Sequence, residues 1–407
     1  MTVRAIAAFA RQAAILGVIA ACVHAQEEQQ TAGQLFRAGL KEYETGDLAK
    51  AADLFDDACR ADAGDWRGQF YRGLTLARLA QLEREPARRN SLFQQAFTAV
   101  DRLTKATGSH FNDPLVLFLE GYVATTAGQY GRGYDRLSEA VRVPRLGWKP
   151  YTRLKLRSHV EETLGIAAMR LGHKTLLAGD FELAQRYLND ADRYLSNDHK
   201  NRNTLEQNLA VVDEGLSQFE SAERHLRNCA KLMPKRRDEF LGVSATMWLG
   251  QQKFDRAKKI LSEIPVNSRD PDVVRARAAL MRELGLKEGD GPQMDAAIAF
   301  YRETLESYPK GRAHRLVVDW CKLVDEKIAP GTEAENTELL KESLGYLRVE
   351  VKLRPECPIW YWFLHKFEFM LGNVDEAARL KLLHERKKLE WAKADKFDQH
   401  GRPRCGS

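Results

Sequence analysis

The chain has 407 residues, of which 44% are hydrophobic and 29% charged, and its formal net charge is +6. This is ordinary globular composition, and it argues against long disordered regions. Charges of both signs are interspersed without a long block of one sign, so nucleic-acid binding is not predicted. Beyond the N-terminal region, no apolar run reaches the roughly 18 residues that a membrane-spanning helix needs.

The N-terminus has the features of a secretory signal peptide. Arg4 and Arg11 supply positive charge, and the apolar stretch 13–21 is too short to cross a bilayer as a helix. The sequence Val23-His24-Ala25 places small residues at the two recognition positions of a cleavage site. The pattern predicts a signal peptide over 1–25 and export of the mature chain to the periplasm or the medium.

A lipid anchor is the alternative at the same segment. Ile19-Ala20-Ala21-Cys22 resembles the bacterial lipobox, whose cysteine receives lipid. In that case the exported protein would be a membrane-anchored lipoprotein with its anchor on Cys22.

The remaining five cysteines lie at wide, irregular intervals and form neither a CxxC motif nor a zinc-ligand spacing. No metal site and no cofactor are therefore predicted. In an oxidising compartment Cys321 and Cys357 could pair, and small core residues on helices are the other interpretation.

A six-position pattern recurs along the chain. It consists of a small or turn residue, a polar residue, an apolar residue, two variable residues and a small residue. Seven copies start at Gly46, Gly128, Gly179, Ser217, Gln252, Pro292 and Gly372, and they end at Ala51, Gly133, Ala184, Ala222, Ala257, Ala297 and Ala377.

This pattern resembles the tetratricopeptide repeat (TPR) family over roughly residues 32–385. Successive copies at Gly179, Ser217 and Gln252 are 38 and 35 residues apart, close to the family's period of about 34. Two longer gaps should each contain one degenerate repeat, at about 66–101 and 311–355. The resemblance implies an all-α, right-handed α-solenoid of about nine TPR-like antiparallel helix pairs.

Three polar segments are predicted to interrupt the pairs as loops: 81–90, 286–293 and 327–336. The array is expected to cover 32–375, and 376–398 should supply the last second helix and a C-terminal cap. This cap would cover the aromatic run Trp360-Tyr361-Trp362-Phe363, which is typical of a buried helix. The tail 399–407 lacks core residues and is expected to be disordered.

The sequence contains no GxSxG, HExxH, P-loop or post-strand GxGxxG motif, and its histidines are dispersed. No catalytic residue is therefore predicted. The leading hypothesis is an exported adaptor or scaffold that holds a protein or peptide in the concave groove of the array. The alternative is an envelope enzyme, for example one acting on glycans, with a carboxylate pair in the superhelix cleft. A structural subunit of an envelope assembly is a third option.

In the TPR family the first helix of each pair lines the groove. Counted back from the turn, one inner position is phenylalanine in each of the first three pairs. These phenylalanines and their neighbours are the predicted partner-binding residues: Phe36, Leu40, Tyr43, Phe70, Phe118 and Tyr122. The alternative is that the phenylalanines pack between helices as core. The family's carboxylate-clamp groove is not supported, because only Arg67 and Arg78 are present for it.

Overall fold

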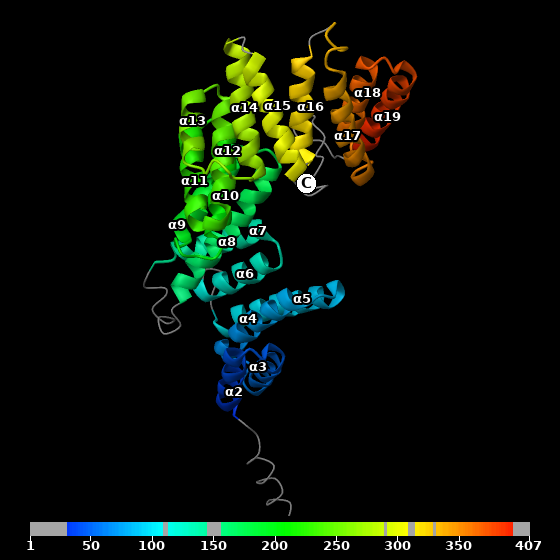
Figure 1. The fold of residues 1–407 in the computed structure, drawn as a ribbon. Coiled ribbons are helices and arrows are strands. Elements are labelled where there is room, and N and C mark those ends of the chain that lie inside the picture. Colours follow the sequence, from blue (N-terminus) through cyan, green and yellow to red (C-terminus); the bar gives the residue numbers. More distant parts are fainter. Residues whose placement is uncertain are drawn as a thin grey trace, which may run out of the picture. The chain divides into compact units, whose positions relative to one another are not determined.

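The computed structural model describes residues 31–108, 113–144, 156–288, 291–307, 314–328 and 331–393. The signal segment, Cys22 and the tail 399–407 lie outside the described residues. Within the described ranges the chain forms eighteen α-helices, one short 3-10 helix and no strand (Figure 1). The all-α fold is therefore confirmed.

The helices follow one another as nine successive pairs. The first helices of the pairs are α2 (Ala32–Thr45), α4 (Trp66–Leu82), α6 (Pro114–Thr126), α8 (Leu156–Leu177), α10 (Arg202–Gly215), α12 (Arg237–Gly250), α14 (Pro271–Glu288), α16 (His314–Lys327) and α18 (Pro358–Met370). The second helices are α3 (Leu48–Ala61), α5 (Pro86–Ala106), α7 (Tyr130–Arg142), α9 (Phe181–Tyr194), α11 (Phe219–Leu232), α13 (Phe254–Ser262), α15 (Gly291–Ser307), α17 (Thr337–Leu353) and α19 (Val374–Lys393). Both degenerate repeats expected from the sequence are present, as α4–α5 and α16–α17.

The turn inside each pair explains the first position of the repeat. Backbone φ is positive at six of the seven positions: Gly46, Gly128, Gly179, Ser217, Gln252 and Gly372. A left-handed residue at this point ends the first helix and lets the chain reverse. At Gly128, for example, the Gln129 N–H donates to the Ala124 carbonyl at 2.9 Å, as in a Schellman turn. Pro292 is the exception, because it lies inside α15.

The small residue at the sixth position lies where the two helices of a pair meet. Ala51, Ala184 and Ala222 are fully buried. A Cβ added at Gly133 would lie 2.2 Å from Thr125 Oγ1, and one at Gly121 would lie 2.5 Å from Leu137 Cγ. Each of these two contacts joins α6 to α7 at equal distances from the turn, so the pair is antiparallel.

Two of the three predicted loops are much shorter than expected. Pro86 begins α5, so only three residues separate α4 from α5. Proline suits the first helical turn, where its missing N–H has no helical partner. Likewise α14 continues to Glu288 and α15 begins at Gly291. The third loop is as predicted, since α16 ends at Lys327 and α17 begins at Thr337.

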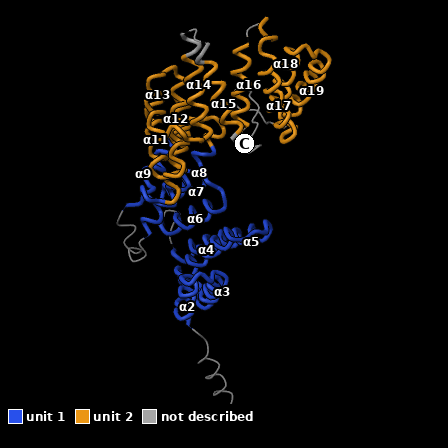
Figure 2. Tube along the Cα trace, in the orientation of Figure 1, with its two compact units in different colours: residues 1–174, 186–199 blue, residues 175–185, 200–407 orange. Residues whose placement is uncertain are grey.

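The described helices divide into two compact units. The first comprises residues 1–174 and 186–199, and the second comprises 175–185 and 200–407 (Figure 2). The first unit has cores around Phe55 and around Leu103, Leu115 and Leu119. In the second unit the largest core is built around Trp320, Trp360 and Phe367. The right-handed superhelix remains a prediction.

The end of the second unit is formed by α18 and α19, where the cap is expected. Trp360, Tyr361 and Phe363 are buried, and Trp391 of α19 joins the same core. Trp362 is 44% exposed, so the aromatic run is not buried on all sides.

Of the two interpretations of the cysteines, small core residues on helices holds for three of them. Cys321 is a free, buried thiol, and so are Cys59 and Cys229. Cys357 is disulfide-bonded, and its partner is therefore not one of these three described cysteines. The Cys321–Cys357 pair is not formed.

Candidate functional site

The candidate site lies in the first unit, on α2, α4 and α6. Polar side chains fix where these helices begin. Thr31 and Gln34 form a reciprocal capping box on α2, while Asp65 accepts from the Arg67 N–H at 3.0 Å on α4. On α6, Asp113 accepts from the Leu115 N–H at 2.8 Å. The caps set the register in which each helix presents its side chains.

The three phenylalanines proposed from the sequence belong to the core. Phe36, Phe70 and Phe118 are 8%, 1% and 3% exposed. The Phe36 ring centroid lies 5.7 Å from that of Phe55, and the Phe70 centroid lies 6.1 Å from that of Phe118. They fill the space between helices, as the alternative interpretation held, and they do not form an exposed apolar track.

The other three proposed residues, Leu40, Tyr43 and Tyr122, are half-buried and therefore partly accessible. Leu40 and Tyr43 pack against the core that contains Phe36. The Tyr122 ring centroid lies 6.0 Å from that of Phe118. The partly exposed residues thus pack on the buried phenylalanines.

Two residues that the sequence analysis did not propose complete this surface. The Tyr71 ring meets the Tyr43 ring edge to face, with centroids 6.0 Å apart, and it also contacts Phe36 and Phe70. The Arg78 guanidinium carbon lies 4.8 Å from the Tyr43 ring centroid, a cation–π distance. We call Tyr43, Tyr71, Arg78 and Tyr122 the tyrosine–arginine patch.

The sequence offered only a weak signal for these two residues. Tyr71 is next to the proposed Phe70, yet neighbouring positions on a helix point about 100° apart. In the sequence, Arg78 is only one of two arginines, with Arg67, that could belong to a carboxylate-clamp groove. What makes it part of a site is the tyrosine ring beneath it, which comes from another helix.

The Tyr71 and Tyr122 phenols are protonated at neutral pH. Burial raises the pKa of Tyr122 to about 12, with Tyr43 adding to the rise and Arg78 opposing it. Burial also raises the pKa of Tyr71. The patch therefore presents neutral hydroxyl groups beside one cation. No described carboxylate forms an ion pair with Arg78, whereas Arg67 is engaged by Asp65 at 2.9 Å.

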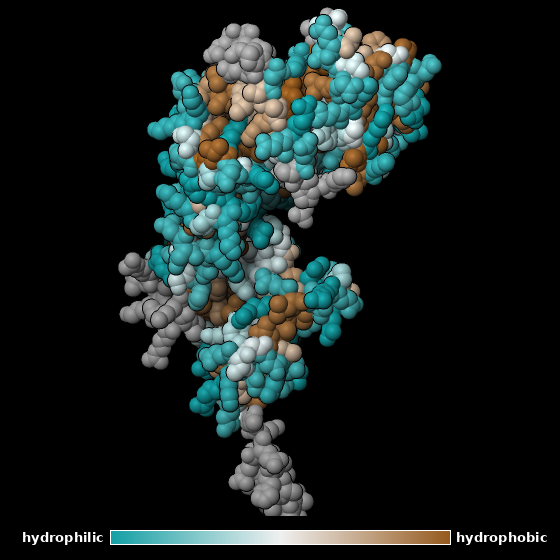
Figure 3. Space-filling model, viewed as in Figure 1, coloured by the Kyte–Doolittle hydropathy of each residue, from teal (hydrophilic) through white to brown (hydrophobic). Residues whose placement is uncertain are grey.

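A second hollow in the first unit lies between α3, α4 and α5. It has a volume of about 650 Å³, and its lining includes Leu79, Leu82 and Leu92 together with Arg88 and Glu83. Apolar side chains gather over α4 and α5 in the space-filling view (Figure 3). This is a mixed apolar and charged surface.

Two carboxylates that line described hollows, Glu83 and Glu220, lack the buried and unpaired environment of a general acid. Glu83 has its pKa lowered by a hydrogen bond from the Glu85 backbone. In a hollow on α11–α13, Glu220 is highly exposed and pairs with Arg256 at 3.0 Å. No group of three potential metal ligands occurs among the described residues.

The helix pairs define an all-α helical-repeat protein. Their period, their left-handed turn residue and their small contact residue make it a tetratricopeptide-like array. No protein-family model and no curated protein matches the chain.

Solved structures match at low similarity. The "MamA RS-1 ArsTM double mutant" is 15% identical with a TM-score of 0.35, covering 51% of this chain and 97% of that one. A tetratricopeptide repeat protein from Parabacteroides merdae is 14% identical with a TM-score of 0.32, covering 72% of this chain and 99% of its own. Yeast Tom70 is 15% identical with a TM-score of 0.34, and the match covers 93% of this chain and 89% of that one. The fold assignment rests on the chain's own helix pairs.

Proposed function

We propose that this protein is an adaptor that binds a segment of a partner protein along α2, α4 and α6. The observation that carries the proposal is the tyrosine–arginine patch. Tyrosine and arginine are enriched among the residues that contribute most to protein interfaces. Here they are partly exposed on three first helices and rest on a buried phenylalanine core.

The chemistry of the patch indicates the kind of segment that fits. Arg78 offers guanidinium donors that no described carboxylate engages, so an acidic side chain of the partner would find a cation there. The neutral phenols can donate to backbone carbonyls of the same segment, and their rings offer apolar area. The proposed ligand is an extended segment with an acidic residue next to an apolar one.

We further propose that the protein acts outside the cytoplasm. The short apolar stretch and the small residues before Gln26 support export, with lipidation of Cys22 as the alternative. The disulfide at Cys357 is in keeping with an oxidising compartment. None of the described helices has the length and apolarity needed to cross a membrane. N-terminal sequencing and fatty-acid labelling of the exported protein distinguish cleavage before Gln26 from a lipid on Cys22.

The enzyme alternative receives no support from a specific observation in the described part of the chain. Its requirement was a cleft with converging carboxylates. The hollows with two carboxylates hold them exposed or paired with arginine, as with Glu220 and Arg256.

The adaptor proposal is tested by partner capture from the native host. Arg78→Gln removes the cation of the patch, and Arg89→Gln, at an exposed position of α5, is the matched control. We expect Arg78→Gln to lose a defined set of partners that the wild type and the control both retain. Equal capture by all three proteins, with equal melting temperatures, would contradict the proposal.

A further inference from the structure

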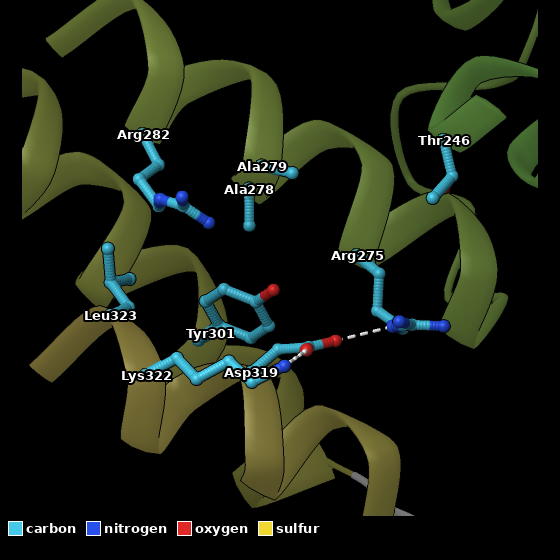
Figure 4. A pocket seen from close by; sticks show the side chains of 9 residues that line it. All are labelled: Thr246, Arg275, Ala278, Ala279, Arg282, Tyr301, Asp319, Lys322 and Leu323. Carbon is cyan, nitrogen blue, oxygen red and sulfur yellow. Dashed lines mark hydrogen bonds and ion pairs between the residues drawn. The ribbon is translucent and has the colours of Figure 1, made fainter. Parts of the chain in front are cut away.

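A small cavity in the second unit has features that the adaptor proposal does not use. It encloses about 90 Å³ on helices α14, α15 and α16, with α12 at its edge (Figure 4). Ala278 and Leu323 supply apolar walls, while Arg275, Arg282 and Lys322 supply three cations and Asp319 supplies one carboxylate. The space can hold a chemical group of a few heavy atoms.

Tyr301 of α15 is buried, yet its hydroxyl points into this cavity between the two arginines (Figure 4). The side chain is 4% exposed, and no described residue makes a hydrogen bond with the hydroxyl. A hydroxyl that lines a cavity can exchange hydrogen bonds with a group bound there. A group inside the cavity could therefore take Tyr301 as a donor.

The cations retain capacity for another ligand. Asp319 accepts from Arg275 Nε at 2.5 Å, and Lys322 Nζ lies 3.8 Å from its other oxygen, beyond hydrogen-bond distance. Arg282 pairs with Glu326 at 2.8 Å and with Glu283 at 3.0 Å, and neither glutamate lines the cavity. Each guanidinium has five N–H donors, so these contacts leave donors available.

The donors come from different helices and approach the cavity from different sides (Figure 4). Arg275 and Arg282 are both on α14 but two turns apart, Lys322 is on α16 and Tyr301 is on α15. A planar carboxylate is satisfied by one guanidinium fork, whereas a tetrahedral oxyanion presents oxygens in several directions. The arrangement therefore favours the tetrahedral group.

We propose that this cavity binds an oxyanion of the size of phosphate or sulfate, through Arg275, Arg282, Lys322 and the Tyr301 hydroxyl. The group could be a free ion or a monoester on a larger molecule, since the recognising chemistry is the same. Asp319 opposes binding, because its charge has the same sign as that of the ligand and it already accepts a hydrogen bond from Arg275.

Calorimetric titration of the full chain with sodium phosphate and sodium sulfate, at constant ionic strength, tests the site. We expect saturable binding of one oxyanion per chain. Tyr301→Phe removes only the hydroxyl oxygen and should weaken binding about tenfold, as should Lys322→Gln. Lys341→Gln, which removes an exposed lysine paired with Glu338, is the control and should leave binding unchanged.

Asp319→Asn separates the proposal from a purely structural role for the cluster. Removing the competing charge should tighten phosphate binding severalfold.

Phosphoethanolamine identifies the source: binding as tight as that of phosphate supports a monoester, and binding of phosphate alone supports a free ion. Absence of saturable binding of either anion by the folded wild type would overturn the proposal. Weaker phosphate binding by Asp319→Asn at an unchanged melting temperature would overturn it as well.

Discussion

At the scale of single residues, the turn inside most pairs uses a left-handed backbone conformation. Two copies of the repeat adopt this conformation without glycine. Ser217 and Gln252 have φ of 60° and 55°, the left-handed region that glycine occupies at Gly46, Gly128, Gly179 and Gly372. The left-handed conformation costs an L-residue roughly 1–2 kcal/mol, because its Cβ crowds the following carbonyl. These two turns therefore carry local strain that the packed helices on either side maintain.

Replacing either residue with glycine should stabilise the protein. Ser217→Gly and Gln252→Gly relieve the strain, and the greater freedom of glycine in the unfolded chain offsets part of the gain. A net increase of about 0.5–1 kcal/mol in the free energy of unfolding is expected, measured by urea denaturation. Gly179→Ala is the converse control and should destabilise the protein. Loss of stability in both glycine variants would contradict this explanation of the turns.

The phenylalanines of the first three pairs contribute mainly to the stability of the folded protein. Phe70 is 1% exposed and contacts Tyr71 and Phe118. Phe70→Ala should lower the free energy of unfolding by about 3–5 kcal/mol, because it leaves a cavity in the core. A thermal melt checks this. A melting temperature equal to that of the wild type would show that the ring is not a core element.

At the scale of elements, buried charges join neighbouring helices. Glu206 of α10 is 1% exposed, and its oxygens accept from Arg202 at 2.9 Å and from Asn228 at 3.1 Å. His225 Nδ1 of α11 lies 2.7 Å from the same carboxylate. Burial alone would raise the pKa of Glu206, but hydrogen bonds from His225, Asn228 and Arg202 outweigh it and lower the pKa to about 2.

This carboxylate should make the protein sensitive to acid. A lowered folded-state pKa contributes stability that is present above the unfolded value of about 4.5 and is lost as the pH falls toward about 2. The shift corresponds to at most about 3–4 kcal/mol. Glu206→Gln should flatten the dependence of unfolding free energy on pH across that window, whereas Glu338→Gln, on the surface, should not. Superimposable pH profiles for wild type and Glu206→Gln would contradict the assignment.

The elements were predictable from the sequence to the extent that they depend on local chemistry. Glycine at a turn and alanine at a close helix contact can be read directly from the sequence. The positions of the helix pairs could therefore be predicted. The loop expected at 81–90 was wrong in length, because polar composition does not distinguish a loop from an exposed helix that starts at Pro86. Of the patch, Tyr43 and Tyr122 were predicted, but the place of Arg78 could not be, because its stacking on Tyr43 depends on how α4 lies against α2.

At the scale of the whole molecule, the chain presents two different kinds of surface. The first unit carries partly exposed aromatic side chains beside an arginine, and the second carries a small cavity lined by cations. A helical-repeat array can combine such surfaces, because each pair is stabilised mainly by its neighbours and its outer residues are free to vary. The fold therefore allows binding at several places, and only the side chains decide what binds.

The central claim is that a partner lies along α2, α4 and α6 in the first unit. Site-specific photocrosslinking in the native host tests this most directly. A photoreactive amino acid replaces Tyr43 or Tyr122 in the patch, and Gln94 on the exposed face of α5 serves as the control position. We expect the same partner protein to be crosslinked from both patch positions and not from Gln94. Crosslinks to that partner from Gln94 alone, or none from either patch position in a folded protein, would contradict the account.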